Sequence, residues 1–513
     1  MNASGRLDDV IVIGSGIGGL AAAAALAKSG RRVLVVEQHF VLGGLTQTFS
    51  RPPYEFATGV HYLAGVGETP EPENQLGHML HWLSEGRLGF APVGSPYDIV
   101  RLPDLEFPIE APREAYVQRL KASFPAESAA IGTYFAACDE ARRAAMSLFA
   151  SKALPAPLAT LVRWLNSGRI HRALDVTSAD AVQGIRDHRL RALLLARWGT
   201  YGLPPAEAPF AVHAMVMASY FPGAYFPIGG PNKFAETLGQ TIRTHGGELR
   251  TRASVADILV EQGHVSGVRL KSGETIAAPI VVSAMGARNT LRALPAELAP
   301  DWREAIQSLS SGVSHVTLYL GFRADIRRLG ATPANVWIYE GEDIGRIWEH
   351  PESENAPQLF VSFPTLKDPA HADAEHHTGE VFAPCRWEPF AAWAESEPGS
   401  RSADYQAAKA RIADTLLAQF ARHFPRLAPT IDFHELSTPL SQAAYVCADR
   451  GAIYGIEMSS KRLRGDALRP GTPVPGLLLA GQDAVGPGIP GALMGGLMAA
   501  AAVEPGLWKE LRA

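Results

Sequence analysis

The stretch DDVIVIGSGIGGLAAAAALAKSGRRVLVVEQ, residues 8–38, decides the fold. Residues 10–13 form a continuous apolar run, which is typical of a buried parallel strand. The glycines of GSGIGG follow at once. An alanine-rich segment after them predicts a helix, and residues 33–36 predict a second buried strand. This order, completed within about 30 residues, indicates a dinucleotide-binding α/β unit.

Each part of this unit has a physical role. Gly14 permits the tight turn, Gly16 lets the backbone approach a pyrophosphate, and Gly19 lets helix and strand pack closely. We expect the neighbouring Gly18 to belong to the same cofactor site. The free N–H groups of the helix N-terminus favour phosphate. Glu37 closes the second strand and is expected to accept hydrogen bonds from ribose hydroxyls.

A ribose-binding acid serves FAD and NAD equally, so Glu37 leaves the choice of cofactor open. The next segment, HFVLGGLTQTF at residues 39–49, places Gly43 and Gly44 just after the second strand. This pair resembles the G-G motif of flavoproteins with the glutathione-reductase-type FAD fold. Those flavoproteins often carry Arg after the pair, whereas this chain has Leu45.

A second G-x-G-x-x-G match, GPGIPG, lies at residues 486–491. Pro487 and Pro490 have no N–H group, so two of the donors that a phosphate turn needs are missing. Only ten residues follow Val503, which leaves no room for a second strand with a terminal acid. The match therefore does not indicate a second dinucleotide site.

The same segment resembles the C-terminal FAD motif of that flavoprotein superfamily. The resemblance implies that Gly481 and Asp483 reach the ribityl and pyrophosphate region, and that a helix from Gly491 aims its positive end at the flavin. The two glycine-rich matches then serve one noncovalently bound FAD.

Composition narrows the class of protein. The chain has 513 residues, 47% of them hydrophobic, and a net charge of −5, so no basic field favours nucleic acid. Its three cysteines are far apart and give no disulfide framework or metal spacing, which favours a reducing cytoplasm. Residues 484–503 are uncharged, but their helical part is too short to cross a bilayer. We expect neither a signal peptide nor a transmembrane segment.

The middle of the chain adds to the cofactor domain. Residues 232–245 predict a helix, residues 255–261 and 265–271 predict a strand pair with a turn at Gly263–His264, and residues 280–284 predict another buried strand. Val255 is a candidate cofactor contact. PIGG, at residues 227–230, lacks the third glycine and the acid of a nicotinamide site.

Taken together, the motifs resemble the phytoene desaturase-related flavoproteins, nearest to the carotenoid isomerase and retinol saturase branches. The resemblance rests on GSGIGG with Glu37, GG at 43–44, FATGVHY at 56–62, PIGG at 227–230, DPAHADAEHH at 368–377, STPLSQAAYVCADRGAIYG at 437–455 and the segment from GQD to GPGIPG. It implies a discontinuous FAD domain, an antiparallel substrate sheet with helices, and a long apolar isoprenoid substrate drawn from a membrane.

The expected fold class is α/β, a Rossmann-type FAD domain with an antiparallel-sheet substrate domain and a helical cap. The expected domains are FAD-binding residues 1–75, 226–295 and 465–513, cap residues 76–225, and substrate-sheet residues 296–464 with strands at 313–323, 334–340, 358–363 and 379–386. The apolar piece from Ala153 to Leu165 fits either a packed helix or a helix on a membrane surface.

The chemistry belongs to the flavin, which moves a hydride to or from the substrate. His61 and Tyr62 are the candidate catalytic residues, since the resemblance places their segment near the flavin ring, and Tyr201 and Tyr445 are weaker pocket candidates. The histidines and acids of 371–377 lack a metal-site spacing, so no metal is expected.

The leading hypothesis is a FAD-dependent oxidoreductase that adds or removes hydrogen across C=C bonds of a carotenoid- or retinoid-like polyene. A redox-neutral cis–trans isomerase using reduced FAD is the alternative. Two further hypotheses are a prenyl or lipid escort protein without FAD and an amine oxidase. The intact glycines with Glu37 argue against an escort protein, and Leu45 argues against an amine oxidase. The expected location is cytoplasmic, and peripheral contact with a membrane stays open.

Overall fold

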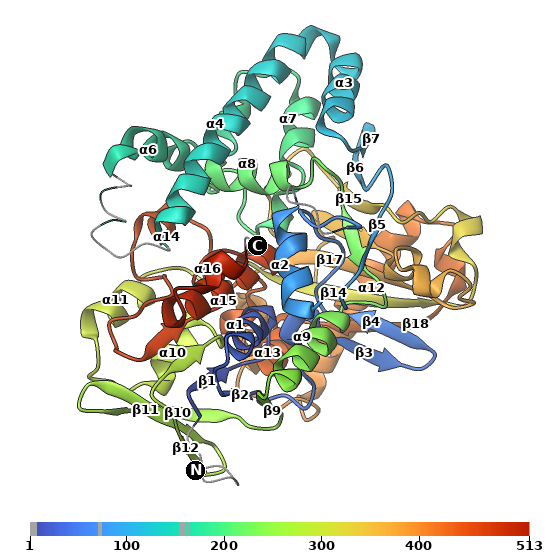
Figure 1. The fold of residues 1–513 in the computed structure, drawn as a ribbon. Helices are drawn as coiled ribbons and strands as arrows, with labels where there is room; N and C mark the ends of the chain where they lie inside the picture. Colours follow the sequence, from blue (N-terminus) through green and yellow to red (C-terminus); the bar gives the residue numbers. More distant parts are fainter. Residues whose placement is uncertain (1–7, 70–73, 153–157, 159–160, 162–163, 512–513) are drawn as a thin grey trace.

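The computed structural model describes residues 8–69, 74–152, 158, 161 and 164–511 (Figure 1). A five-stranded parallel sheet forms its base, in the order β19 (Leu477–Leu479), β13 (Val281–Ser283), β1 (Val10–Ile13), β2 (Val33–Val36), β9 (Glu248–Arg250). These strands come from three distant parts of the chain. The predicted α/β fold class is confirmed.

Alternating side chains of β1 serve two hydrophobic cores. Val10 and Val12 pack with α1 (Ile17–Lys28), α9 (Lys233–Thr244) and α15 (Gly488–Val503). Ile11 and Ile13 pack on the other face, toward the antiparallel strands β10 (Val255–Glu261), β11 (His264–Leu270) and β12 (Thr275–Ala277). Burial on both faces explains why β1 is apolar throughout.

The turn between β10 and β11 lies one residue earlier than predicted. Gln262 and Gly263 both have positive φ, 50° and 80°, as a two-residue type I′ hairpin turn requires. His264, which we expected inside the turn, is the first residue of β11.

A seven-stranded sheet forms the second layer. Its order is β18 (Ile431–Ser437), β14 (Ser314–Phe322), β17 (His377–Cys385), β16 (Gln358–Ser362), β15 (Asn335–Tyr339), β6 (Asp98–Leu102), β7 (Leu105–Ile109). All neighbours are antiparallel except β15 and β6. Apolar side chains on one face pack on α12 (Ala403–His423), which leaves the other face free to line a cavity.

Residues 76–225 are not helical throughout. They contain α3 (Arg113–Ser123), α4 (Ser128–Lys152), α6 (Ser167–Asp175), α7 (His188–Leu195) and α8 (Phe210–Ser219), but also β6 and β7, which extend the substrate sheet. The alternating pattern of YDIVRL at residues 97–102 was the missed strand signal. The division of the chain into three domains remains our proposal, with residues 98–109 added to the sheet.

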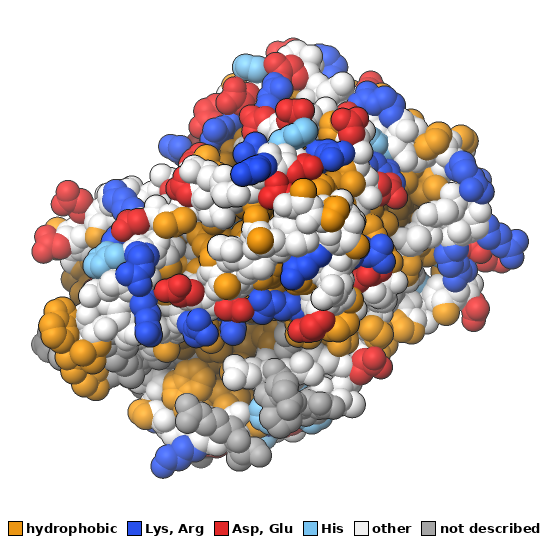
Figure 2. All heavy atoms as spheres, turned by 90° about the horizontal axis from the view of Figure 1, so that it is seen from above, with side chains coloured by type: hydrophobic (Ala, Val, Ile, Leu, Met, Phe, Trp, Pro, Cys, Tyr) orange, Lys and Arg blue, Asp and Glu red, His pale blue; other side chains and the backbone are white. Residues whose placement is uncertain are grey.

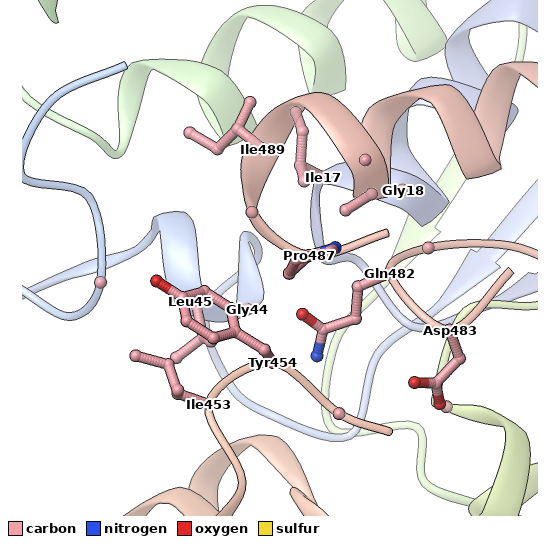
Figure 3. A pocket seen from close by; sticks show the side chains of 18 of the residues that line it. Ile17, Gly18, Gly44, Leu45, Ile453, Tyr454, Gln482, Asp483, Pro487 and Ile489 are labelled. Carbon is pink, nitrogen blue, oxygen red and sulfur yellow. The ribbon is translucent and has the colours of Figure 1, made fainter. Parts of the chain in front are cut away.

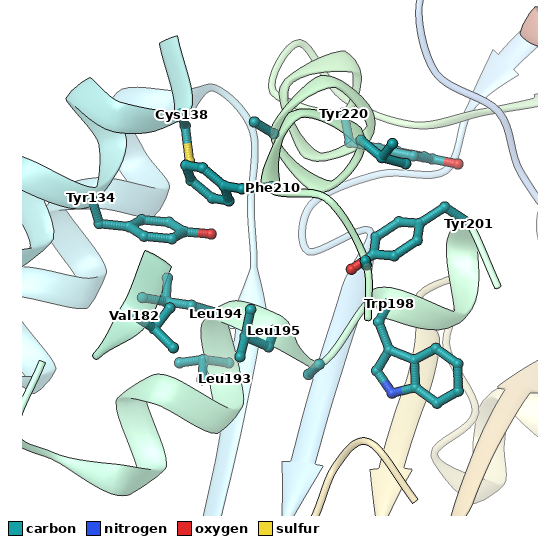
Figure 4. Packing of buried hydrophobic residues seen from close by; sticks show 14 of the residues in the cluster. Tyr134, Cys138, Val182, Leu193, Leu194, Leu195, Trp198, Tyr201, Phe210 and Tyr220 are labelled. Atoms are coloured by element: carbon teal, nitrogen blue, oxygen red, sulfur yellow. The ribbon is translucent and has the colours of Figure 1, made fainter. Parts of the chain in front are cut away.

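The cap helices pack in a hydrophobic core that continues to Trp337 and Tyr339 of β15, and in it Tyr134, Cys138 and Phe210 meet the leucines of α7 (Figure 4). Further elements complete the fold: β3 (Thr48–Arg51), β4 (Tyr54–Ala57), α2 (Gln75–Ser84), β5 (Phe90–Pro92), β8 (Tyr225–Pro227), α10 (Ala287–Ala293), α11 (Pro300–Gln307), α13 (Pro439–Val446), α14 (Ser460–Arg464) and α16 (Leu507–Glu510). Seen from above, acidic and basic side chains are interspersed over the surface (Figure 2).

Much of the apolar piece from Ala153 to Leu165 lies outside the described residues. Its described large side chains are exposed by half or more, at Leu158, Leu161, Trp164 and Leu165. The interpretation of a packed helix expected these side chains to be buried in the core, and they are not. Within the described ranges, none of the helices is both long and apolar enough to cross a bilayer.

Candidate functional site

The turn GSGIGG joins β1 to α1 and shows why its glycines are required. Gly14 has φ +93°, a conformation that side chains rarely adopt. A Cβ on Gly19 would lie 2.0 Å from the carbonyl oxygen of Gly14, whereas a Cβ on Gly16 would meet nothing within 4 Å. Gly19 is therefore required for packing, whereas Gly16 borders open space where a ligand could approach the main chain.

Glu37 is bound to this turn. Its Oε2 accepts hydrogen bonds from Ser15 N at 2.8 Å and Ser15 Oγ at 2.7 Å, and its Oε1 accepts one from His39 N at 2.8 Å. The carboxylate thus organises the glycine turn itself. Oε1 keeps a lone pair for a ribose hydroxyl, because a carboxylate oxygen accepts two hydrogen bonds.

The second glycine pair lies beside the first turn. Gly43 N donates to Ser15 O and Ser15 Oγ, each at 3.1 Å. Gly43 and Gly44 have φ +120° and +56°, so the pair turns sharply where it meets Gly16. Both glycines line the same cavity as GSGIGG, and so does Val255 at the start of β10.

The C-terminal motif completes the cradle, by which we mean residues 14–19, 43–44 and 481–491 around one end of the cavity. The Asp483 carboxylate accepts from Ile456 N at 3.0 Å and from Ala287 N at 2.8 Å, which joins three separate loops. The helix α15 begins at Gly488, three residues before the predicted Gly491, with Pro487 as its N-cap. Pro487 can hold this position because an N-cap residue donates no helical hydrogen bond.

Glycines also bring the two helices together. A Cβ on Gly18 of α1 would lie 2.8 Å from Ala492 O of α15, and a Cβ on Gly496 of α15 would lie 2.1 Å from Gly18 O. Figure 3 shows Pro487 at the start of α15, close to Gly18 of α1. The positive ends of two helices therefore face one region, which favours an anionic ligand there.

The cradle opens into a cavity of about 1500 Å³. The cavity extends from the glycine turns to the free face of the seven-stranded sheet, where Trp337, Phe360 and Phe382 form an apolar wall. Single ligand pockets are commonly about 300–1000 Å³. This cavity is therefore large enough for a cofactor and an apolar substrate together.

His61 lies in this cavity, on the sheet side. Its ring centroid is 4.4 Å from that of Phe382 and 5.5 Å from that of Phe360, both edge-on. Its Nδ1 is 2.8 Å from Oε2 of Glu380 on β17. A histidine beside a buried carboxylate is equipped for proton transfer.

Tyr62 lines the cavity, but its hydroxyl is occupied. It donates to Asp98 Oδ2 at 3.2 Å, and Asp98 also lies 3.3 Å from Nη1 of Arg197. Burial, followed by the charge of Asp98, raises the pKa of Tyr62 well above its usual value. The phenol therefore stays protonated.

The weaker pocket candidates separate. Tyr201 is buried in the cap and contacts His213 Nδ1 at 3.1 Å, outside the residues that line the cavity. Tyr445 lines the cavity with its side chain 51% exposed.

The histidines of 371–377 point to different partners. His371 Nδ1 lies 3.2 Å from Asp368 Oδ2, and His377 Nδ1 lies 3.1 Å from Thr365 Oγ1. Asp368 Oδ1 accepts from Gly229 N at 3.0 Å and so ties the PIGG loop to this segment. Across the described part of the chain, no three His, Cys, Asp or Glu side chains are grouped as metal ligands.

Sequence reasoning missed four buried charged residues. Glu380 and Lys367 lie beside His61, and Asp98 accepts from the Tyr62 hydroxyl. The Arg462 guanidinium donates to the carbonyl oxygens of Gln482 and Asp483 in the C-terminal motif. An acid within the apolar run of HTGEVFAPC was the available signal for Glu380. Arg462 stands in the polar run SSKRLRGD, which resembles a solvated surface, and gave no such signal.

Comparison with known proteins agrees with this geometry. A model of NAD(P)-binding Rossmann-like domains matches residues 12–79. The chain is 32% identical to all-trans-retinol 13,14-reductase of Rattus norvegicus, over 98% of this chain and 87% of the relative. It is 26% identical to the chloroplastic prolycopene isomerase of Daucus carota, over 87% of this chain and 71% of the relative. A solved triple mutant of putrescine oxidase superposes with TM-score 0.67 at 18% identity, covering 97% and 99% of the two chains.

The Rossmann unit and the cavity that joins it to the sheet, together with the 32% identical retinol reductase, define a dinucleotide-dependent oxidoreductase. More narrowly, the chain belongs to the phytoene desaturase-related flavoenzyme family, among its retinol saturase and carotenoid isomerase branches. The predicted family and the predicted enzyme class are both confirmed. The likeness to putrescine oxidase concerns the fold alone.

Proposed function

We propose that this protein is a FAD-dependent oxidoreductase that adds hydrogen to, or removes it from, a C=C bond of a long apolar polyene, with a retinoid-like compound as the first candidate. The observation that carries the proposal is the single cavity that joins the glycine cradle to an apolar sheet face bearing His61. The name of the 32% identical relative, a retinol reductase, supports the substrate class.

The residues at the cradle fit FAD. Gly14, Gly16, Gly43 and Gly44 would admit the pyrophosphate at the N-terminus of α1, and Glu37 would accept from the adenosine ribose. Val255, Gly481 and Asp483 border the same cavity, and α15 directs a second helix N-terminus into it. Bound FAD would supply the hydride chemistry that the polyene reaction needs.

The binding is noncovalent in this proposal. Cys447 lines the cavity, but its Sγ lies 3.0 Å from the Gln38 amide nitrogen, next to Glu37 and so at the ribose end. A thiol at that end is distant from where a flavin ring would lie. Precipitating the protein with acid should release all FAD into the supernatant, whereas a yellow pellet would contradict noncovalent binding.

The chain's own residues would do three things in the reaction. Phe360, Phe382 and Trp337 bind and align the polyene and exclude water. The cradle orients the cofactor against it. His61 moves the proton that accompanies the hydride, while Tyr62, whose hydroxyl is held by Asp98, shapes the wall.

A redox-neutral cis–trans isomerase is the second candidate, favoured by the 26% identity to a prolycopene isomerase. Electron balance separates the two. We would mix anaerobically reduced enzyme with retinoids and carotenoids and follow flavin absorbance and product mass. Saturation oxidises one flavin per product and adds two mass units; isomerisation leaves both unchanged. The same mixing with oxidised enzyme tests removal of hydrogen, which would reduce one flavin per product and subtract two mass units. If no polyene changes in mass and none is isomerised with either form of the enzyme, the proposal is refuted.

Contact with a membrane surface is part of the proposal, because an apolar polyene resides in lipid. The exposed side chains of Leu158, Leu161, Trp164 and Leu165 support it. Replacing Trp164 and Leu165 by Ser should reduce co-sedimentation with liposomes. Unchanged co-sedimentation would count against this contact surface.

A further inference from the structure

A row of polar side chains crosses the cavity face of the seven-stranded sheet. Glu380 on β17 is opposite Ser362 on β16, and Asn335 on β15 is opposite Asp98 on β6. All four side chains are completely buried. Polar groups in such a place are costly unless they are paired, so each requires a partner.

Lys367 spans this row. Its Nζ donates to Ser362 Oγ at 2.6 Å, to Asn335 Oδ1, and to the backbone carbonyl of His61 at 2.8 Å. The ammonium is buried at 3% exposure and therefore fixes the main chain of His61 against the sheet.

Glu380 faces the side chain of the same histidine. Its Oε1 accepts from Ala57 N at 3.0 Å, and its Oε2 lies 2.8 Å from His61 Nδ1. The ring N–H is not aligned with the oxygen, so neither atom has a hydrogen bond of good geometry, and neither has another partner. Since these two buried polar atoms have no other partner, a rotation of the imidazole about χ2 would align the N–H with the oxygen.

We infer that Glu380 is a positioning residue for His61: it holds Nδ1 as a donor and leaves Nε2 directed at the substrate in the cavity. The inference rests on the proposed function, for which His61 is the proton-transfer residue. No other buried carboxylate of the described residues contacts the His61 ring.

The other groups around His61 do not take over this role. His315, on β14, is 5% exposed and lies 5.5 Å from the Phe382 ring that also contacts His61. Burial, and then the charge of His61, lower the pKa of His315 to about 4, so it is neutral at pH 7. Lys367 contacts the backbone of His61, and the Tyr62 hydroxyl is bound to Asp98.

In saturation, bound FAD would supply the hydride to one alkene carbon, and the π electrons, left on the other carbon, would take the proton from Nε2 of the His61 imidazolium. The Nε2–H bond breaks and its electrons stay on the nitrogen. His61 becomes a neutral imidazole that still donates from Nδ1 to Glu380, and solvent later returns a proton to Nε2.

Glu380→Gln tests the inference because an amide has one oxygen where the carboxylate has two. The amide oxygen must accept from Ala57 N–H, so the NH₂ group faces His61 Nδ1 and donates to it. The neutral imidazole is thereby changed to the Nε2–H tautomer. If the Glu380 carboxylate only filled space, its replacement by Gln would leave the tautomer of His61 unchanged.

The first measurement is the tautomer, and it needs no substrate. In protein labelled with ¹⁵N-histidine, the resonances absent from His61→Gln belong to His61. At high pH, wild-type protein should show Nδ1 protonated and Nε2 not, and E380Q should show the reverse. Wild-type protein with the Nε2–H tautomer would overturn the inference, whether or not E380Q folds.

The second measurement is the substrate half-reaction. E380Q should lower the rate at saturating polyene by about 100-fold, the scale of general acid catalysis, with KM changed less than about threefold. The His61→Gln/Glu380→Gln double variant should be no slower than His61→Gln, because Glu380 acts through His61. Additive losses would overturn the inference.

Glu340→Gln is the matched control. Glu340 follows β15 of the same sheet but contacts Gln419, Arg422 and His423 at α12, outside the cavity. It should keep the wild-type tautomer and rate. Absence of polyene turnover in every protein would refute the proposed function, while the tautomer would still decide the role of Glu380.

Discussion

The Glu37 carboxylate receives three hydrogen bonds from its own chain, at Ser15 and His39, and retains capacity for one ribose hydroxyl at Oε1. Glu37→Ala should therefore weaken FAD binding in two ways, by losing the ribose contact and by loosening the turn. Hydrogen bonds to a charged group contribute about 1.5–3 kcal/mol, so we expect about 10–100-fold weaker binding. Titration of apo-protein with FAD measures it. Ser15→Ala is the control: it removes the Ser15 Oγ bond to Glu37 and one of the two acceptors of Gly43 N–H, but it keeps the carboxylate. Unchanged affinity in Glu37→Ala would contradict the assignment.

Alanine substitutions at Gly16 and Gly19 separate two roles of the glycine turn, which are access for the cofactor at Gly16 and close packing at Gly19. Gly16 has φ −61° and an unobstructed Cβ position, so Gly16→Ala should fold normally without cofactor and bind FAD at least 10-fold more weakly. In Gly19→Ala the new Cβ meets Gly14 O at 2.0 Å, so the backbone must move. Overpacking costs about 1–3 kcal/mol or more, and thermal unfolding of apo-protein should show it only in Gly19→Ala. Equal melting temperatures for the two variants would contradict this separation.

At the scale of elements, sequence patterns predicted what local physics determines. The glycine turn, α1, β2, β10, β11 and the four central strands of the substrate sheet follow from apolar periodicity and turn residues. The β6–β7 hairpin was missed because it lies among helices in the chain and gains its stability from pairing with β15, more than 200 residues away. Likewise, His61 was predicted from its segment, but Glu380 and Lys367 could not be recognised from the sequence. Pairing of β17 with β16 places Glu380, and the loop after β16 places Lys367, beside His61 only in the folded protein.

Lys367, buried on the cavity face of the sheet, should make the stability of the fold depend on pH. Burial lowers the pKa of Lys367 to about 7, so between pH 7 and its ordinary value the unfolded chain holds more protons than the folded one. Stability contributed by Lys367 therefore rises with pH in this range. Lys367→Met removes the titration. The melting temperature of wild type minus that of Lys367→Met should increase from pH 7 to pH 9. The exposed Lys461→Met should leave its difference flat, and a Lys367 difference that falls with pH would contradict the burial argument.

At the scale of the whole molecule, three separated parts of the chain line the cavity that we propose as the cofactor site. The glycine turn of β1 and α1, the strand β10 and the motif before α15 all border one cavity, and the distant sheet closes it. Such a site cannot form until these segments meet. The two glycine-rich matches, 472 residues apart from Gly14 to Gly486, line one cavity, and we propose that they serve a single cofactor site.

This arrangement leads to a prediction about the electron source. In the described residues, PIGG does not border the cavity and its Gly229 N–H is already bound by Asp368, while GPGIPG belongs to the first cofactor's cradle. We therefore expect no separate nicotinamide site. NADH and NADPH should reduce the bound flavin slowly and without saturation at micromolar concentrations, in anaerobic stopped-flow followed at the flavin absorbance.

Dithionite, which needs no binding site, should bleach the same flavin fully and serves as the control. Electrons would then reach the enzyme from the polyene, a quinol, a partner protein, or a reduced nicotinamide that enters the same cavity in turn. These routes differ in one respect: only the last is blocked when an apolar polyene already fills the cavity. Slow reduction by NADPH that is abolished by bound polyene would indicate this route. Fast, saturable reduction by either nucleotide, unaffected by polyene, would show a second dinucleotide site and overturn the prediction.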